Sequence, residues 1–180
     1  MTERLWAGWR MAYLRGASES AGGAGDCLFC SLAGQDPSSR TLVLERYRHA
    51  FLVLNAFPYT TGHLMVAPYR HAEDLLSESM EARAEILAAL ERARVALARE
   101  YGPDGFNLGA NLGRAAGAGV IGHLHWHLVP RWLGDTNFMP AVAGVRVIPE
   151  ALPDTYARLL AALANTVPEG VTVEGRGGDA

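Results

Sequence analysis

The sequence lacks most of the features that would take the protein out of the ordinary globular class. It has 2 cysteines in 180 residues, too few for a disulfide framework, so a reducing, cytoplasmic setting is expected. No run of about eighteen apolar residues occurs, which argues against a membrane span. The net charge of −3 argues against a dedicated nucleic-acid binder. The N-terminal residues interleave charges with apolar side chains and indicate a short amphipathic helix, not a signal peptide.

The hydrophobic patterning predicts one α+β domain with an antiparallel sheet of about five to six strands. Strands are expected at residues 42–45, 50–54, 63–67, 106–112 and 123–129, with 143–147 as a candidate sixth. One long helix is expected over 71–101, where Gly102 and Pro103 stop it, and a C-terminal helix over 149–165. The long helix is expected to bury a stripe made of Leu75, Leu76, Met80, Ile86, Leu87, Leu90, Val95 and Leu97.

The chain is expected to divide into three parts. Residues 1–26 comprise an N-terminal helix over 1–16 and a flexible linker rich in glycine, alanine and serine over 17–26. The domain is expected to span 27–168, and residues 169–180 are expected to form a disordered tail.

Three histidines alternate with large apolar residues in the run GHLHWHLVP, at His123, His125 and His127. This period-2 alternation predicts a strand on which the three imidazoles share one face, about 7 Å apart. One interpretation is a metal-binding stripe or an accidental polar face. The other is nucleophilic catalysis, because a neutral imidazole near pH 7 is both a nucleophile and a proton carrier.

The two cysteines, Cys27 and Cys30, form a CxxC pair that has three interpretations. A redox pair would need a thioredoxin-like βαβ context, which the sequence does not show. Two small buried residues that happen to lie close together are the second interpretation. The third is half of a zinc site, which needs two further ligands.

The triad resembles the pattern His-φ-His-φ-His-φ-φ of the histidine triad (HIT) family. Further segments follow the family order: Asn55 in LNAFPY, His63 in TGHLMVAP, Asn111 in GANLGRAAGAG, and then PRW and GDTNF. The resemblance runs from about Cys27 to Val147. Together with the opening RLWAGWRMAYL, these segments are most similar to the branch with bacterial diadenosine tetraphosphate phosphorylases and related hydrolases.

The resemblance implies a nucleotide hydrolase or nucleotidyltransferase that cleaves adenosine polyphosphates at the α-phosphate. His125 would attack phosphorus and form a covalent AMP–histidine, which divides one difficult displacement into two easier ones. Water or phosphate would then free the product, so hydrolysis and phosphorolysis to ATP and ADP both stay open. His127 would stabilise charge on the phosphoryl oxygens, and His63 would be a further active-site histidine.

Other functions stay open beside this one. They are hydrolysis of an adenosine phosphoramidate or of another dinucleoside polyphosphate, nucleotide binding with little turnover, and hydrolysis by a catalytic metal held by all three triad histidines.

The resemblance also implies a set of nucleotide contacts. Asn55 would hold the ribose hydroxyls, although an Asn in this place also suits a turn. Asn111 would contact the phosphates, as would backbone N–H groups of Gly117, Ala118 and Gly119. Many family members have a glutamine near Ala118 and a spacer shorter by about one residue, so here phosphate recognition is expected to shift to the backbone.

The zinc interpretation gains ligands from the resemblance, which implies a structural Cys₂His₂ site made of Cys27, Cys30, His71 and His123. His49 is the alternative to His71. The family commonly forms homodimers by extending the sheet across two subunits. The expected partners are therefore a small-molecule nucleotide and a second copy of the chain, with no nucleic acid or membrane.

Overall fold

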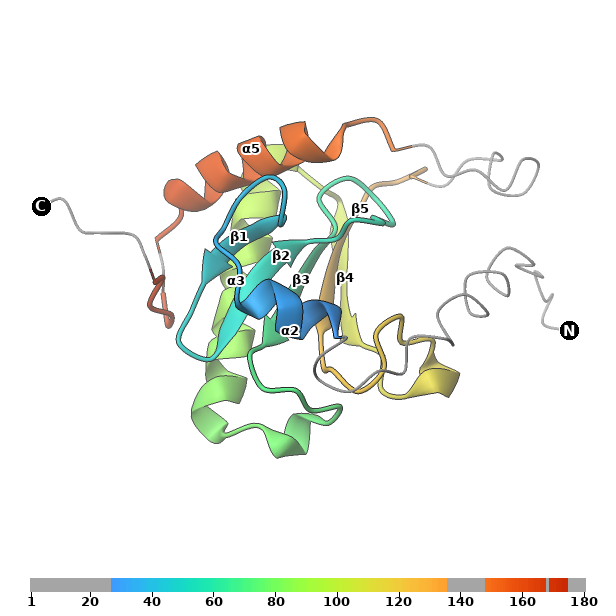
Figure 1. The fold of residues 1–180 in the computed structure, drawn as a ribbon. Coiled ribbons are helices and arrows are strands. Elements are labelled where there is room, and N and C mark those ends of the chain that lie inside the picture. The colour runs from blue at the N-terminus through green and yellow to red at the C-terminus, as the bar shows by residue number, and fades with distance from the viewer. Residues whose placement is uncertain (1–26, 136–147, 168, 175–180) are drawn as a thin grey trace, which may run out of the picture.

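The computed structural model describes residues 27–135, 148–167 and 169–174 (Figure 1). The expected N-terminal helix, the linker and the candidate strand at 143–147 lie outside the described residues. Within the described residues, no helix is both long and apolar enough to cross a membrane.

A five-stranded antiparallel sheet forms the centre of the domain and confirms the expected α+β class, with the order β1-β2-β3-β5-β4. The strands are β1 (Val43–Arg46), β2 (Ala50–Leu54), β3 (Leu64–Pro68), β4 (Gly105–Ala110) and β5 (Trp126–Arg131). Every residue of β2 and β3 is buried, which explains why AFLVL and LMVAP are continuous apolar runs and not alternating ones.

Helices α3 (Met80–Tyr101) and α5 (Leu152–Ala164) pack against one face of the sheet and against each other. The prediction that α3 begins at residue 71 is wrong. Asp74 instead caps a single 3₁₀ turn, η2 (Leu75–Ser77), and the Ser79 hydroxyl then caps α3 by accepting the N–H of Ala82 at 3.1 Å. Gly102 ends α3 in the left-handed conformation, with φ 52°.

The buried face of α3 differs in part from the expected stripe. Ile86, Leu90 and Leu97 are buried as predicted. Leu76, Met80 and Leu87 are exposed by 77%, 73% and 57%, so the prediction was wrong for them. Leu76 lies in η2 and not in α3. Within α3, the 100° rotation per residue prevents neighbours such as Ile86 and Leu87 from facing the same core, and small alanines fill the buried face instead.

A buried ion pair joins α3 to β1 and α5. The Arg92 guanidinium donates to both carboxylate oxygens of Glu45 at 2.8 Å and to the carbonyl oxygens of Leu163 and Thr166 near the end of α5. Both charged side chains are 1% exposed. Residues 169–174, expected to belong to the tail, lie against β1, where the N–H of Glu174 donates to the Arg46 carbonyl at 2.8 Å.

The other face of the sheet carries a short helix, α2 (Leu28–Ala33), which the sequence analysis did not predict. Its Phe29 packs against Phe51 and other side chains from this face. Arg46 donates to the carbonyl oxygens of Leu32 and Ala33 at 3.2 and 2.8 Å, so β1 holds the last turn of α2.

Candidate functional site

The triad histidines lie where the chain enters β5, on the α2 face of the sheet. The prediction that one strand carries all three is wrong, because β5 begins only at Trp126. On the N-terminal side of Trp126, the hydrogen-bond ladder between β5 and β3 ends. Pro68 has no N–H to extend this ladder, and the Leu124 N–H donates to the Ala72 carbonyl instead. Antiparallel pairing of Met65 with His127 brings the start of β3, and so His63, beside the triad.

A backbone hydrogen bond holds His125 in one tautomer. Its Nδ1–H donates to the backbone carbonyl of His123 at 2.9 Å, which leaves the lone pair on Nε2. The side chain is buried, and burial lowers the pKa of His125, although the hydrogen bond to that carbonyl acts in the opposite direction. His125 is therefore neutral at pH 7, with an unprotonated Nε2.

A chain of hydrogen bonds fixes the proton positions on the two neighbouring histidines. The backbone N–H of Tyr59 donates to Nδ1 of His63 at 3.1 Å, so the proton of His63 is on Nε2. That Nε2–H donates to Nδ1 of His127 at 3.0 Å, which places the proton of His127 on its own Nε2. Burial, and secondarily His125, lowers the pKa of His127 to about 4, so at pH 7 it is a neutral hydrogen-bond donor.

These three imidazoles form one cluster. The ring centroids of His125 and His127 are 4.9 Å apart, and those of His63 and His127 are 5.1 Å apart. The cluster offers one lone pair on His125 and one N–H donor on His127, the two groups that a nucleophilic displacement at a charged centre requires.

Asn55 lies beside this cluster. Its Oδ1 accepts the N–H of Phe57 at 2.9 Å, as in an Asx turn, and its Nδ2 lies 3.3 Å from Nδ1 of His63, to which it donates. The side chain therefore supports the turn and the tautomer of His63. Its contact with a ribose stays a prediction.

The glycine-rich segment before the triad forms a compact turn. η3 (Arg114–Ala116) ends at Gly117, which has φ 86° and donates its N–H to the Arg114 carbonyl at 3.0 Å. The Gly117 N–H is therefore already hydrogen-bonded within the turn and is not available to donate to a phosphate oxygen. Ala118 and Asn111 line one small hollow together with His123.

Two aromatic residues near the cluster were missed by the sequence analysis. The Tyr59 ring lies 4.5 Å from the His63 ring and 6.1 Å from the His127 ring. Phe29 lies 4.8 Å from His125. Both aromatics are visible in the sequence, in FPYTTGH and CLFC. Their contacts with His125 and His127 could not be predicted because neither residue is close to the triad along the chain, and only the contact of Tyr59 with His63 is local.

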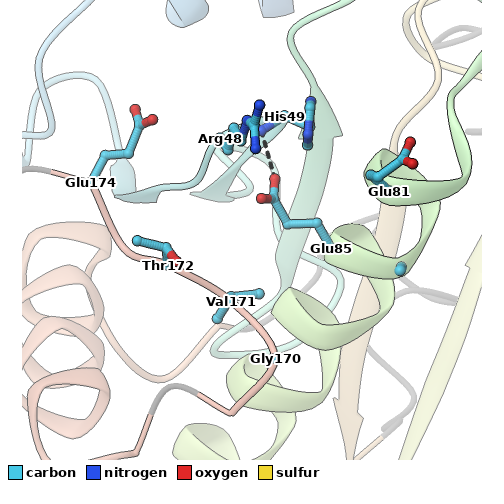
Figure 2. A pocket seen from close by; sticks show the side chains of 9 residues that line it. Arg48, His49, Glu81, Glu85, Gly170, Val171, Thr172 and Glu174 are labelled. Atoms are coloured by element: carbon cyan, nitrogen blue, oxygen red, sulfur yellow. Dashed lines mark hydrogen bonds between the residues drawn. The ribbon is translucent and has the colours of Figure 1, made fainter.

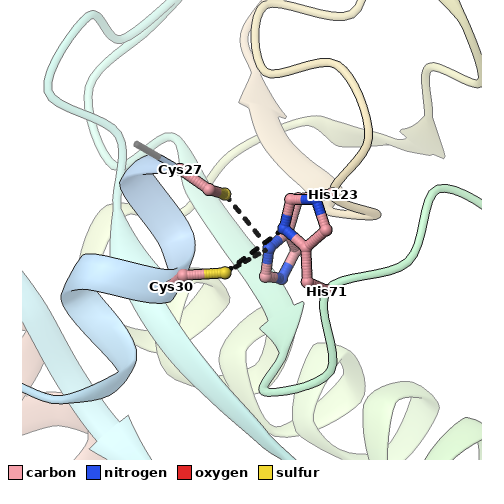
Figure 3. Close-up of side chains that lie close together, drawn as sticks. All are labelled: Cys27, Cys30, His71 and His123. Atoms are coloured by element: carbon pink, nitrogen blue, oxygen red, sulfur yellow. Dashed lines mark hydrogen bonds between the residues drawn. The ribbon is translucent and has the colours of Figure 1, made fainter. Parts of the chain in front are cut away.

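Cys27, Cys30, His71 and His123 converge at the edge of the same region (Figure 3). Sγ of Cys27 is 3.3 Å from Nδ1 of His123, and Sγ of Cys30 is 3.2 and 3.5 Å from Nδ1 of His71 and His123. Tetrahedral zinc, with Zn–S near 2.3 Å and Zn–N near 2.0–2.1 Å, separates its ligand atoms by roughly 3.4–3.8 Å. Two thiols and two imidazoles at these distances fit zinc.

The orientation of His123 also fits a metal ligand. Its Nε2–H donates to the Pro68 carbonyl at 2.9 Å, which leaves Nδ1 facing the two sulfur atoms. In the described part of the chain, these four residues are the one group placed to hold a metal. His123 and His127 are thus directed to different partners, so the three triad histidines do not converge on one metal ion.

A cavity of about 730 Å³ lies away from the triad and is separate from this chemistry (Figure 2). It is lined by Arg48, His49, Glu81, Ala84, Glu85, Gly170, Val171, Thr172 and Glu174. The backbone N–H of His49 donates to Glu85 here at 2.6 Å. His49 lines this cavity, and the group that includes the two cysteines contains His71 and not the alternative His49.

Comparisons with known proteins agree with this arrangement. A family profile described as "HIT domain" matches residues 37–132. A protein named AP-4-A phosphorylase from Mycobacterium tuberculosis is 41% identical over 165 residues, which are 88% of this chain and 83% of that protein. The crystal structure of a Zn-bound histidine triad family protein from Mycobacterium smegmatis is 30% identical, with a TM-score of 0.62 over 79% of this chain and 96% of that one. These matches confirm the resemblance that the motifs predicted.

Proposed function

The chain belongs to the histidine triad (HIT) family, and from that premise we propose that it cleaves adenosine polyphosphates at the α-phosphate through an adenylylated His125. The observation that carries the proposal is the pairing of a neutral Nε2 lone pair on His125 with an N–H donor on His127. The M. tuberculosis relative named AP-4-A phosphorylase supports diadenosine tetraphosphate as substrate and phosphate as acceptor.

The proposed first step forms one bond and breaks one. Nε2 of His125 attacks the α-phosphorus, and the bond from that phosphorus to the bridging oxygen breaks, so ATP leaves. The Nε2–H of His127 stabilises the charge on the departing oxygen as a hydrogen-bond donor, and the hydrogen bond from Nε2–H of His63 to Nδ1 of His127 keeps that donor in place.

In the second step the acceptor attacks the phosphorus of AMP–His125 and the P–N bond breaks. Phosphate as acceptor yields ADP, and water yields AMP. Nε2 of His125 regains its lone pair in either case, so the enzyme returns to its starting state.

The same site would bind the nucleotide mainly through polar groups at its rim. We propose that Asn55 contacts the ribose hydroxyls and that Asn111 contacts the phosphates, with backbone donors from Ala118 and Gly119, because the Gly117 N–H already donates to the Arg114 carbonyl. Asn55 is already oriented by its bonds to Phe57 and His63, so it presents a fixed amide and not a mobile one.

The products of diadenosine tetraphosphate test the function. The protein is incubated with this substrate, with and without phosphate, and the nucleotides are separated. ATP and ADP formed only with phosphate indicate a phosphorylase, and AMP and ATP indicate a hydrolase. Tight binding without product would contradict catalysis and favour a nucleotide-binding role.

We propose that the cysteine–histidine cluster holds a structural zinc ion. Zinc with four protein ligands has no open position for substrate, so its contribution would be to tie α2 to the segments that carry His71 and His123. Both cysteines are free thiols in the structure, as thiolate ligands require.

Cys27→Ser and His71→Ala are expected to lower the metal content from about one zinc per chain to almost none, because each removes one of four ligands. Elemental analysis after dialysis measures the change, and the melting temperature should fall with it. His49→Ala is the matched control and should keep its zinc. Full zinc content in Cys27→Ser would show that the ligand set is wrong.

The stability of the protein should depend on pH through His127. Its pKa is about 4 when folded and about 6.5 when unfolded, so between these pH values the unfolded chain binds a proton that the folded protein does not. The free energy of unfolding therefore falls as the pH is lowered from 6.5 towards 4. Urea unfolding of His127→Gln should show a shallower pH dependence, by at most about 1.4 kcal/mol per pH unit. An unchanged slope would contradict the shift, and His49→Gln is the control.

We also propose that the chain forms a homodimer through β4. This strand lies at the edge of the sheet, and its Leu108 is 53% exposed. Leu108→Arg is expected to convert a dimer to a monomer in light scattering, whereas Leu133→Arg, at a loop residue that is 91% exposed, should leave the dimer intact. A monomeric native protein would contradict the proposal.

A further inference from the structure

Phe29 connects the cysteine pair to the proposed nucleophile. It lies between Cys27 and Cys30 in the sequence, on α2, and is 1% exposed. Its ring centroid is 5.2 Å from that of His123 and 4.8 Å from that of His125, both within the range of favourable aromatic contacts. One side chain of α2 therefore touches both a proposed metal ligand and the proposed nucleophile.

His125 needs such a contact to keep its ring in one orientation. The hydrogen bond from its Nδ1–H reaches only two residues back, to the His123 carbonyl. Nε2 must stay free to attack, so no hydrogen bond from that atom can orient the ring. The described ring contacts of His125 are with Phe29 and His127, and packing against Phe29 restrains the imidazole without occupying Nε2.

The helix that carries Phe29 is itself held at both ends. Cys27 and Cys30, near its start, belong to the metal cluster. Arg46 binds the carbonyl oxygens of Leu32 and Ala33 at its end. A helix of six residues has little stability of its own, so these two attachments determine where Phe29 lies.

We propose that Phe29 is a positioning residue that transmits the geometry of the cysteine–histidine site to His125. The Phe29 ring holds the His125 imidazole in the orientation in which Nε2 faces the α-phosphorus. This inference rests on the proposed function for its kinetic effect, but the orientation of the ring can be measured without any turnover.

The test compares Phe29→Leu with Phe51→Leu, both with zinc supplied in excess. Phe51 is equally buried and lies 6.4 Å from Phe29 in the same core, but it has no recorded ring contact with His125. For Phe29→Leu, kcat is expected to fall by about ten- to hundredfold while KM changes by less than about twofold. Phe51→Leu should lower the melting temperature but leave kcat within about twofold. Equal kcat values for the two variants would overturn the proposal.

Imidazole nitrogen NMR spectra supply a readout that does not depend on activity. In the native protein and in Phe51→Leu, His125 should show a single Nδ1–H tautomer. In Phe29→Leu its signals should broaden or show both tautomers, and a sharp, native His125 signal would overturn the proposal. Phe29→Met, which also lacks the ring but has a flexible side chain that adapts to its surroundings, replaces Phe29→Leu if that variant does not fold. If the native protein turns over no nucleotide, the proposed function fails, and these spectra still decide the role of Phe29.

Discussion

His125→Ala is expected to lower kcat for diadenosine tetraphosphate by about a thousandfold or more. The substitution removes the Nε2 lone pair that we propose as the nucleophile, while His63 and His127 keep the hydrogen bond between their rings. Without a nucleophile, no AMP–histidine can form, and the two-step route is lost. Steady-state rates measure the loss, and mass spectrometry of protein quenched in alkali, where the P–N bond survives, should detect bound AMP on the native chain but not on the variant.

Two controls separate loss of chemistry from loss of structure. His49→Ala removes a histidine from the cavity away from the triad and should leave kcat unchanged. Calorimetric titration of His125→Ala with a nucleotide should still show binding, because the proposed rim contacts remain. Substantial turnover by His125→Ala would exclude the covalent route through this residue.

The largest expected effect on stability comes from Arg92→Ala. This change leaves the carboxylate of Glu45 buried beside the hydroxyl of Tyr47 without its cation, and it removes the donors to the end of α5. Breaking a buried pair in this way destabilises a protein by about 3–5 kcal/mol. Urea unfolding measures this loss, and the melting temperature should fall on the order of 10 °C.

Arg94→Ala is the matched control on the same helix. Arg94 pairs with Glu91, but the two side chains are 43% and 61% exposed, and an exposed pair contributes about 0–1 kcal/mol. If Arg92→Ala and Arg94→Ala lower the free energy of unfolding by the same amount, the buried pair does not stabilise the packing of α3, β1 and α5.

The sheet was predictable because its strands are short apolar runs with turns between them. The expected ranges 50–54 and 63–67 closely match β2 and β3. The helix α2 was not predictable in the same way, because six residues have only a weak local preference for helix. Its position depends on contacts with Arg46 and the metal cluster, whose residues lie far away in the sequence. The predicted start of α3 was too early because two N-caps follow each other closely in the sequence. Asp74 begins the short turn η2, and Ser79 begins α3.

The sequence by itself determined the family and the α+β class and named the candidate site residues, because residue types and their spacing carry that information. It also brought the correct four metal-site candidates together by resemblance. Only the tertiary structure decided how the triad divides: His123 turns towards the cysteines, the lone pair of His125 is on Nε2, and His127 is a donor. These roles depend on backbone groups of Pro68, His123 and Tyr59, and the sequence does not show which imidazole nitrogen a backbone group will reach.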